Sequence, residues 1–301
     1  MQKTLISIIG STGIGKTKLA IEMAKHFGTE IISCDSRQFF KEMKIGTATP
    51  TDEELAQAKH HFIGHLSVQD YYSIGQYEED ALEKIEEIFE KNDFAVLVGG
   101  SMMYEKAVVE GLNDLPEANA ENQEKLQKIL DEEGLEKLQE ILKNLDEEYY
   151  NVVHKENPRR LLRAIDVIWQ TGRKYSEIIA EPKHKRDFKV VRIGVTAPRE
   201  IMYERINLRV DKMLENSLID EVKSLTKYQK LVPLQTVGYT EIFKYLEGTW
   251  DLDFAIEEIK KNSRRYAKRQ ETWNRKVENV TWLPYDYSEE QLHEILSKIE
   301  K

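Results

Sequence analysis

A phosphate-binding loop stands near the start of the chain, where residues 8–20 read IIGSTGIGKTKLA. The pattern G-x-x-x-x-G-K-T is typical of a loop whose glycines let backbone N–H groups converge on a phosphate at the start of a helix. In such a loop Lys16 reaches the terminal phosphates and the Thr17 hydroxyl binds Mg²⁺. A plain glycine-rich turn would not explain the GKT triplet. The predicted phosphate-binding residues are Gly10, Ser11, Thr12, Gly13, Ile14, Gly15, Lys16 and Thr17.

A carboxylate follows the second apolar segment of the chain, in the sequence CDSRQ at residues 34–38. Ligands of parallel α/β sheets bind at the carboxyl ends of the strands, so Asp35 is expected beside the phosphate loop. There Asp35 can act as a general base, and Gln38 can hydrogen-bond the edge of an adenine. The alternative is that Asp35 or Ser36 only caps the start of a helix.

A third apolar segment, FAVLV at residues 94–98, ends without an acid. Enzymes that hydrolyse nucleoside triphosphates keep an aspartate at the end of such a strand, because its carboxylate positions Mg²⁺. Here the segment runs into Gly99, Gly100 and Ser101. A nucleotide-driven motor or switch is therefore disfavoured.

Strands and helices alternate around these residues. This alternation predicts an α/β fold of the P-loop NTPase type, with a parallel sheet and helices on both faces. After residue 196 the pattern is again mostly helical. The predicted strands are residues 5–9, 29–36, 94–100 and 190–196, and the predicted helices between them include 16–27 and 77–91.

The middle of the chain, residues 113–189, shows helical spacing and no strand. Its clearest helix reads NPRRLLRAIDVIWQTG, in which Asn157 caps the start, Pro158 occupies the first turn and Gly172 ends the helix. We therefore predict an all-helical domain at 113–189, inserted into a core formed by residues 1–112 and 190–301.

Charge is unevenly distributed along the 301 residues. The net charge is −10, which argues against nucleic-acid binding by the chain as a whole. Residues 260–276, however, contain eight Lys or Arg and one Glu. One concentrated basic segment can bind RNA on an otherwise acidic protein.

The composition also bears on location. Cys34 is the only cysteine, so no disulfide can form within the chain. No apolar run is long enough to span a bilayer, and the first apolar segment begins too early to leave room for a secretory signal. We expect a cytoplasmic protein that has no membrane partner and acts as a monomer.

These segments together resemble the tRNA dimethylallyltransferases, also called tRNA isopentenyltransferases. The phosphate loop of that family, GPTxxGKT, corresponds to GSTGIGKT, and its DSxQxYxxMxIGTAKP corresponds to DSRQFFKEMKIGTATP at residues 35–50. The segments VGGSMMYEKAVVEG, NPRRLLRAIDVIWQTGRKYSE, TVGYTE and AKRQETW also resemble family motifs. The resemblance covers residues 5 to about 285.

The resemblance implies transfer of a dimethylallyl group from its diphosphate to the exocyclic amine of the adenosine that lies 3′ to the anticodon. The loop, Lys16 and an Mg²⁺ on Thr17 would hold the departing diphosphate. Asp35 would accept a proton from the amine, and Ser101 would help to position that amine. Arg205 and Arg209 would close over the diphosphate, although a solvated helix face is the alternative for this pair.

The resemblance also implies contacts with the anticodon stem-loop of tRNA. Gln123 stands where the family often has an arginine near the tRNA. For the arginines of residues 159–163 the alternative is an exposed polar face, and for residues 264–273 it is a helix of solvated charges. The implied tRNA-binding residues are Asp35, Ser36, Arg37, Gln38, Ser101, Gln123, Arg159, Arg160, Arg163, Arg264, Arg265, Lys268, Arg269, Gln270 and Trp273.

Besides Gln123, the chain departs from the family pattern at three places, one of which is Ser217 in place of the glycine usual before Leu218. Ser11 replaces a usual proline, which should change only the rigidity of the loop, and Met102-Met103 replace Gly-Leu, which bears on donor preference. Three other functions compete with tRNA prenylation: a small-molecule kinase, an RNA-binding switch, and an enzyme that prenylates free adenine nucleotides. The basic segment and the inserted helices disfavour the first and third.

Overall fold

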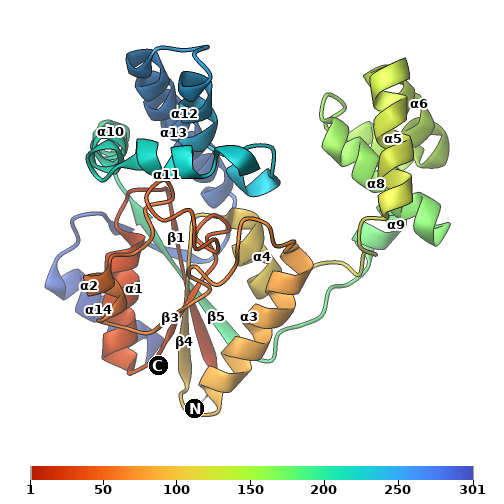
Figure 1. Cartoon of the computed structure of the whole chain (residues 1–301). Coiled ribbons are helices and arrows are strands. Elements are labelled where there is room, and N and C mark those ends of the chain that lie inside the picture. Colours follow the sequence, from red (N-terminus) through yellow and green to blue (C-terminus); the bar gives the residue numbers. More distant parts are fainter. Residues whose placement is uncertain (1, 301) are drawn as a thin grey trace. The chain divides into compact units, whose positions relative to one another are not determined.

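The computed structural model describes residues 2–300 and divides into two compact units (Figure 1). The first unit comprises the chain up to Val109 and again from Arg186 onward, and the second comprises Glu110–Lys185. The sequence places the helical insertion at 113–189, so the second unit begins and ends slightly earlier in the chain than that prediction. Among the described residues, no helix combines the length and apolarity that crossing a membrane requires.

A parallel sheet forms the centre of the first unit, with the strand order β3-β2-β4-β1-β5-β6. Strand β1 lies between β4 and β5, and all of its residues are buried. This position explains its largely apolar sequence, in which the hydroxyl of the one central polar residue, Ser7, donates to Glu105. Within residues 2–300 the strands are β1 (Thr4–Gly10), β2 (Ile31–Ser33), β3 (His60–His61), β4 (Phe94–Val98), β5 (Lys189–Thr196) and β6 (Val280–Pro284).

The two strands at the edges, β3 and β6, are absent from the sequence prediction. Strand β3 has only two residues. Strand β6 is partly exposed, with 40% of Trp282 accessible to solvent, so it lacks the continuous apolar run that marks a buried strand. The prediction of mostly helical structure after residue 196 therefore missed the strand that completes the sheet.

Helices cover both faces of the sheet, which confirms the predicted α/β fold (Figure 1). On one face Ile6 and Ile8 of β1 pack with residues of α1 and α14, and on the other Leu5 packs with residues of α3 and α4. The bounds of these helices are α1 (Lys16–Phe27), α3 (Ile74–Phe89), α4 (Met102–Glu110) and α14 (Glu289–Ile299).

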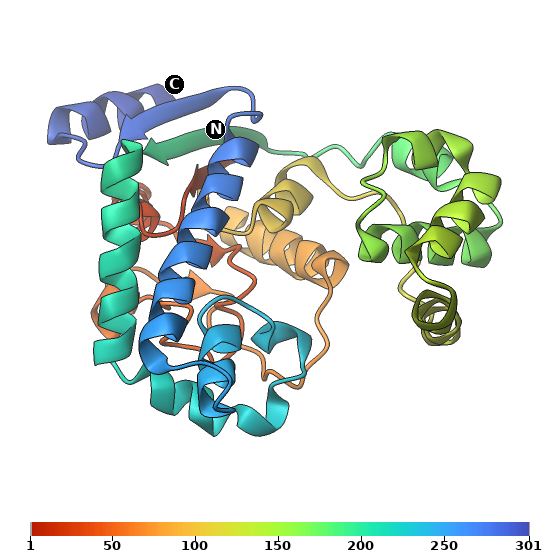
Figure 2. The ribbon, with the colours of Figure 1, turned by 90° about the horizontal axis from the view of Figure 1, so that it is seen from above.

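The first unit also contains the short helix α2 (Asp52–Leu55), between β2 and β3. Its remaining helices follow strand β5 in the chain. Figure 2 shows α10 and α13 side by side, and they pack through Met202, Ile206 and Ala267. These later elements are α10 (Arg199–Glu215), α11 (Leu218–Ser224), η1 (Thr226–Tyr228), η2 (Val232–Leu234), α12 (Tyr239–Leu246) and α13 (Leu252–Asn274).

The second unit is helical throughout its described elements. Its core gathers leucines that recur at helical spacing, among them Leu126, Leu138 and Leu161. The N–H of Arg160 donates to the side chain of Asn157, as expected of a helix cap, and Gly172 ends the same helix with positive φ. The helices are α5 (Ala120–Glu133), α6 (Leu135–Leu145), α7 (Glu147–Val152), α8 (Pro158–Thr171) and α9 (Tyr175–Ala180).

Candidate active site

A cavity of about 970 Å³ opens at the carboxyl ends of β1, β2 and β4. This is the edge where a parallel α/β sheet binds its ligands. All of the residues that line the cavity belong to the first unit. Of the residues predicted from the sequence, the cavity is lined by Thr12, Gly13, Ile14, Gly15, Lys16, Thr17, Asp35, Ser36, Arg37, Gln38, Arg205, Arg209, Arg269 and Gln270.

The loop between β1 and α1 has the backbone geometry of an anion site. Gly13 and Gly15 have φ of +76° and +109°, a region that side chains other than glycine rarely adopt. At Gly10 a Cβ atom would lie 2.7 Å from the carbonyl oxygen of Val195. Gly15 precedes α1 and brings no side-chain cap, and the first turn contains no acidic residue. The N–H groups of that turn therefore face the cavity without a competing anion.

Lys16 lies inside this loop. Its Nζ donates a hydrogen bond to the carbonyl oxygen of Ser11 at 2.7 Å. Burial lowers the pKa of Lys16 to about 8; the carboxylate of Asp35 acts against this shift and the cation of Arg209 adds to it. A diphosphate bound in the loop would place negative charge beside Lys16, and this charge would favour the protonated form that burial disfavours.

The two arginines of α10 contact the loops around the cavity. The Nε of Arg205 donates to the carbonyl oxygen of Gly13 at 2.9 Å, and an Nη of Arg209 donates to that of Thr47 at 2.8 Å. Burial lowers the pKa of Arg209, and the carboxylate of Asp35 partly offsets this effect. Both side chains border the cavity, where Arg209 is half-buried and Arg205 is exposed.

Asp35 lies in a turn. No α-helix follows it, so it is not the helix cap that the sequence left as an alternative. One carboxylate oxygen, Oδ1, accepts the N–H of Arg37 at 3.1 Å. The other, Oδ2, approaches Gly100 so closely that a Cβ on that glycine would lie 3.4 Å from it. The carboxylate thus reaches the cavity beside the end of β4.

Ser101 lies behind Ser36 at the same end of the cavity. Its Oγ accepts the N–H of Ser36 at 3.0 Å, and the two hydroxyl groups are 2.9 Å apart. Arg37 and Gln38 turn to the protein's own backbone: Arg37 contacts the carbonyl oxygens of Val232 and Pro233, and Gln38 contacts those of Thr47 and Ala48. The donor groups of Gln38 are therefore already used within the chain.

Helix α13 has a buried and an exposed side. Gln270 is fully buried; its Oε1 accepts the N–H of Thr12 at 2.9 Å and its Nε2 donates to the carbonyl oxygen of Gly100 at 2.7 Å. Tyr266 donates to that same oxygen at 3.1 Å. Gln270, implied by the resemblance as a tRNA contact, thus joins two loops of the protein.

The other residues named on α13 lie farther from the interior. Arg264 donates to Asn207 at 2.6 Å, and Trp273 is half-buried, with the ammonium of Lys106 5.8 Å from its ring centroid. Arg265, Lys268 and Arg269 are exposed, and we call these three residues the outer basic face of α13. Of the three, Arg269 also borders the cavity, with its guanidinium 5.6 Å from the ring centroid of Tyr266.

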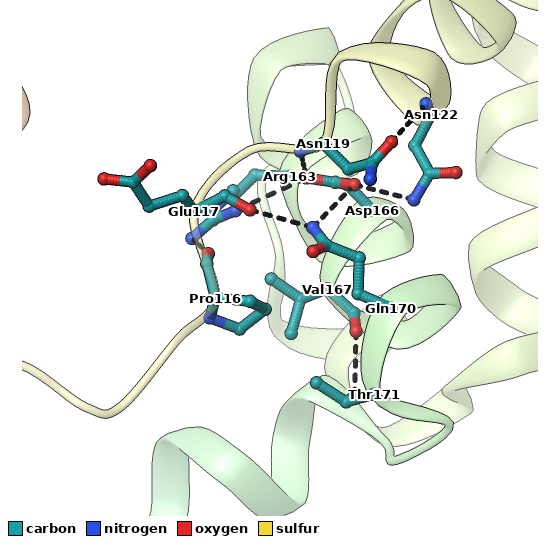
Figure 3. Close-up of polar contacts among 9 residues, drawn as sticks. All are labelled: Pro116, Glu117, Asn119, Asn122, Arg163, Asp166, Val167, Gln170 and Thr171. Carbon is teal, nitrogen blue, oxygen red and sulfur yellow. Dashed lines mark hydrogen bonds and ion pairs between the residues drawn. The ribbon is translucent and has the colours of Figure 1, made fainter.

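Four predicted tRNA contacts belong to the second unit, where Gln123 is half-buried on α5 and Arg159 and Arg160 are exposed on α8. Arg163 is instead engaged within its unit, as Figure 3 shows: it donates to the carbonyl oxygen of Pro116 at 2.5 Å and to Asp166 at 3.4 Å.

Asp166 is fully buried and collects further donors around Arg163. Its Oδ1 accepts from Asn122 and from Gln170, each at 3.0 Å, and Gln170 also donates to the carbonyl oxygen of Glu117 (Figure 3). A buried carboxylate needs such partners. Arg163, on helix α8, therefore links that helix to the segment before α5 through its hydrogen bond to Pro116.

Residues of the site that were not named from the sequence include Thr47, Tyr266 and Glu271, whose carboxylate accepts the hydroxyl of the loop residue Ser11. Thr47 lies in the quoted motif IGTATP, and Glu271 follows Gln270 in AKRQETW, so both stand inside segments already recognised. Tyr266 precedes Gln270 by one helical turn, and this i, i+4 spacing is the signal that could have found it. Burial raises the pKa of Tyr266 to about 12, so its hydroxyl stays a donor at neutral pH.

Comparison with known proteins shows which family this chain resembles. A family model described as IPP transferase matches residues 38–277. The tRNA dimethylallyltransferase of Christiangramia forsetii is 49% identical over 300 residues, which cover 99% of either chain. The tRNA dimethylallyltransferase 1 of Bacteroides fragilis is 46% identical over 298 residues, which cover 99% of this chain and 98% of the relative.

Solved structures resemble the chain over nearly its whole length. The full-length tRNA isopentenylpyrophosphate transferase from Bacillus halodurans matches with a TM-score of 0.73 and 36% identity, over 99% of this chain and 96% of that one. A eukaryotic dimethylallyltransferase, described as acting on tRNA, matches with a TM-score of 0.86 and 26% identity, over 98% and 79%. The family model, the relatives and the solved structures agree with one another, and the chain belongs to the IPP transferase family of tRNA prenyltransferases.

Proposed function

We propose that the protein transfers the dimethylallyl group of dimethylallyl diphosphate to the exocyclic amine of the adenosine 3′-adjacent to the anticodon of tRNA. The observation that carries this proposal is the shared cavity, which brings the phosphate loop and Asp35 together. Strand β4 ends in glycines where a nucleotide hydrolase keeps its acid, so a reaction that only requires diphosphate to leave fits the site better.

The loop end of the cavity suits a leaving diphosphate. As the carbon–oxygen bond breaks, negative charge grows on the diphosphate, and fixed N–H donors and cations stabilise it. The α1 N–H groups, Lys16 and Arg209 would supply this stabilisation, and Arg205 would close the loop over the ligand.

Mg²⁺ would share that end of the cavity. Among the described residues no cluster of three or more His, Cys, Asp or Glu could hold a metal by itself. This fits Mg²⁺ held mainly by the diphosphate, since magnesium commonly binds substrate phosphates, water and few protein ligands. The Thr17 hydroxyl, which lines the cavity, is the ligand that we propose, and the ion would neutralise charge on the leaving group.

The Asp35 end of the cavity suits the acceptor. Asp35 would take a proton from the exocyclic amine as the new carbon–nitrogen bond forms. Ser101 would orient that amine or the turn that carries Asp35, since its hydroxyl holds Ser36. No phosphoryl group moves in this reaction, so the proposal differs from a kinase in the bond that breaks.

The tRNA would reach the cavity through its anticodon loop. Bases in such loops are already splayed, so drawing one adenosine into the site costs less than from a duplex. The outer basic face of α13 would contact the phosphates. We further propose that the protein works as a monomer in the cytoplasm, where its RNA substrate is found.

One assay tests the proposal against its alternatives. The protein is mixed with Mg²⁺, labelled dimethylallyl diphosphate and an anticodon stem-loop with adenosine after the third anticodon base. Parallel reactions replace the stem-loop with AMP, or the prenyl donor with ATP. We expect label in the RNA, its loss in Asp35→Ala and its retention in Asp187→Asn, a control at an exposed position. Label in free AMP but not in RNA would indicate an adenylate prenyltransferase. Phosphoryl transfer from ATP without prenylated RNA would indicate a kinase.

A further inference from the structure

Ser11 connects the phosphate loop with other parts of the site through its carbonyl oxygen and its hydroxyl. The residue is fully buried. Its carbonyl oxygen accepts the hydrogen bond from Lys16, and its hydroxyl donates to Oε1 of Glu271 on α13. The serine that replaces the usual proline of the family loop therefore gains a partner that proline cannot have, because proline has no donor.

The next residue of the loop is held by the neighbouring residue of the helix. The N–H of Thr12 donates to Oε1 of Gln270 at 2.9 Å, while Nε2 of Gln270 donates to the carbonyl oxygen of Gly100. Two consecutive loop residues thus bind two consecutive residues of α13. We call the set of Ser11, Thr12, Gln270 and Glu271 the loop clamp.

The loop clamp has the chemistry of a positioning device. Gln270 has no solvent-exposed surface, and both ends of its amide are already paired within the protein. Because the N–H of Thr12 is already paired, it is not among the donors that a phosphate would take. Gly13 and Gly15 follow at positive φ, and a loop so rich in glycine loses much conformational freedom when it orders around a ligand.

We propose that Gln270 and Glu271 are positioning residues that hold the phosphate loop, through Ser11 and Thr12, in the geometry that binds the diphosphate of the prenyl donor. This inference rests on the proposed function. It assigns to the AKRQETW segment a role on the donor side of the reaction, in addition to any contact with tRNA. Gln270 also sets the spacing between the loop and Gly100, which neighbours Ser101.

A comparison of two substitutions at one position tests the role of Glu271. Glu271→Leu and Glu271→Gln remove the same negative charge, but only leucine removes the acceptor that Ser11 needs. The probe is inorganic pyrophosphate with Mg²⁺, measured by calorimetry. We expect Glu271→Leu to weaken its binding about tenfold, the effect of one lost partly buried hydrogen bond. Glu271→Gln should bind as tightly as the wild type or more tightly, because a carboxylate near the anion is gone.

A double-mutant cycle with Ser11→Ala shows whether the two side chains act through one contact. Ser11→Ala should weaken pyrophosphate binding to a similar degree, and combining it with Glu271→Leu should add little. The same variants should raise the KM for dimethylallyl diphosphate and leave the KM for the stem-loop RNA unchanged. Thr272→Ala, exposed on the same helix, is the matched control.

Thermal unfolding separates positioning from general stability. Pyrophosphate affinity and donor KM within twofold of wild type in Ser11→Ala and Glu271→Leu would overturn the inference, whether or not the melting temperature falls. An equal loss in Glu271→Gln and Glu271→Leu would also overturn it, because the lost charge and not the lost acceptor would then explain the effect. No pyrophosphate binding by the wild type would instead refute the proposed function on which the inference rests.

Discussion

Helix α13 presents two polar faces that differ in what surrounds them. On the inner face, Tyr266, Gln270 and Glu271 each have a partner within the protein, and Gln270 is fully buried. On the outer basic face, Lys268 and Arg269 are exposed. Buried polar groups cost free energy when a partner is removed, whereas exposed charges act over a distance and are weakened by salt. The inner face therefore sets geometry, and the outer face supplies attraction for a polyanion.

The largest effect should come from the cavity itself, at Asp35. Asp35→Asn keeps the shape of the side chain but cannot accept a proton, so kcat should fall by about 10² to 10⁴. Pyrophosphate binding should not weaken by more than about twofold, since the loop contacts remain and a nearby carboxylate loses its charge. Rapid-quench measurement of label transfer to RNA checks this. An unchanged kcat would remove the general base from the proposed mechanism.

Lys16 offers a comparison between a buried cation and the exposed ones. Its pKa is lowered to about 8, so the empty site favours the neutral amine above that pH, and the ligand must then recharge it. Pyrophosphate affinity should be constant below pH 8 and fall above it, approaching tenfold per pH unit. Lys16→Arg should lack this step, because a guanidinium stays charged. Calorimetry between about pH 6.5 and 9.5 measures pyrophosphate affinity for the wild type and for Lys16→Arg. The titration of pyrophosphate itself affects both proteins equally, so the difference between them reports Lys16.

Gln270 should show an intermediate effect on the inner face. Gln270→Met has a similar volume but leaves the N–H of Thr12 without its partner and the carbonyl oxygen of Gly100 with only the hydroxyl of Tyr266. We expect the chain to lose about 1–3 kcal/mol of stability and kcat/KM for the donor to fall about tenfold. The salt dependence of RNA binding should match the wild type. A changed salt slope with normal donor kinetics would show that the residue serves RNA after all.

The smallest effect at low salt should come from the outer basic face. Arg265→Ala combined with Lys268→Ala should weaken stem-loop binding several-fold and reduce the slope of log K against log salt by about 0.7 for each lost phosphate contact. Because neither substitution touches a catalytic group, kcat at saturating RNA should stay the same. An unchanged slope would mean that tRNA binds elsewhere on the protein.

Much of the fold follows from local patterns. The loop between β1 and α1 was predictable because its backbone needs positive φ at Gly10, Gly13 and Gly15, and few other residues adopt that conformation. Helix α8 was predictable from its punctuation by Asn157, Pro158 and Gly172, which needs no partner elsewhere in the chain. Strand β6 was not, because an exposed edge strand is defined by the neighbour with which it pairs.

The site divides in the same way. Asp35 and Lys16 could be named because each stands at a fixed offset in a motif. The opposite roles of Gln270 and Arg269 could not be separated, since both are polar and adjacent on a helix without a strong apolar stripe. Arg163 shows the same limit: only the structure reveals the buried Asp166 beside it. Which polar residue faces inward depends on contacts distant in sequence.

The diglycine that ends β4 bears on how this protein could evolve. A Cβ on Gly99 would lie 2.5 Å from the carbonyl carbon of Cys34 and 2.7 Å from the N of Asp35, both backbone atoms that cannot move aside cheaply. A mutation that introduced an acid there, as a nucleotide hydrolase needs, would displace the turn that carries Asp35. A prenyltransferase that evolved toward hydrolysis by a mutation at Gly99 would thus first become a variant with a displaced Asp35. Selection would tend to remove such a variant.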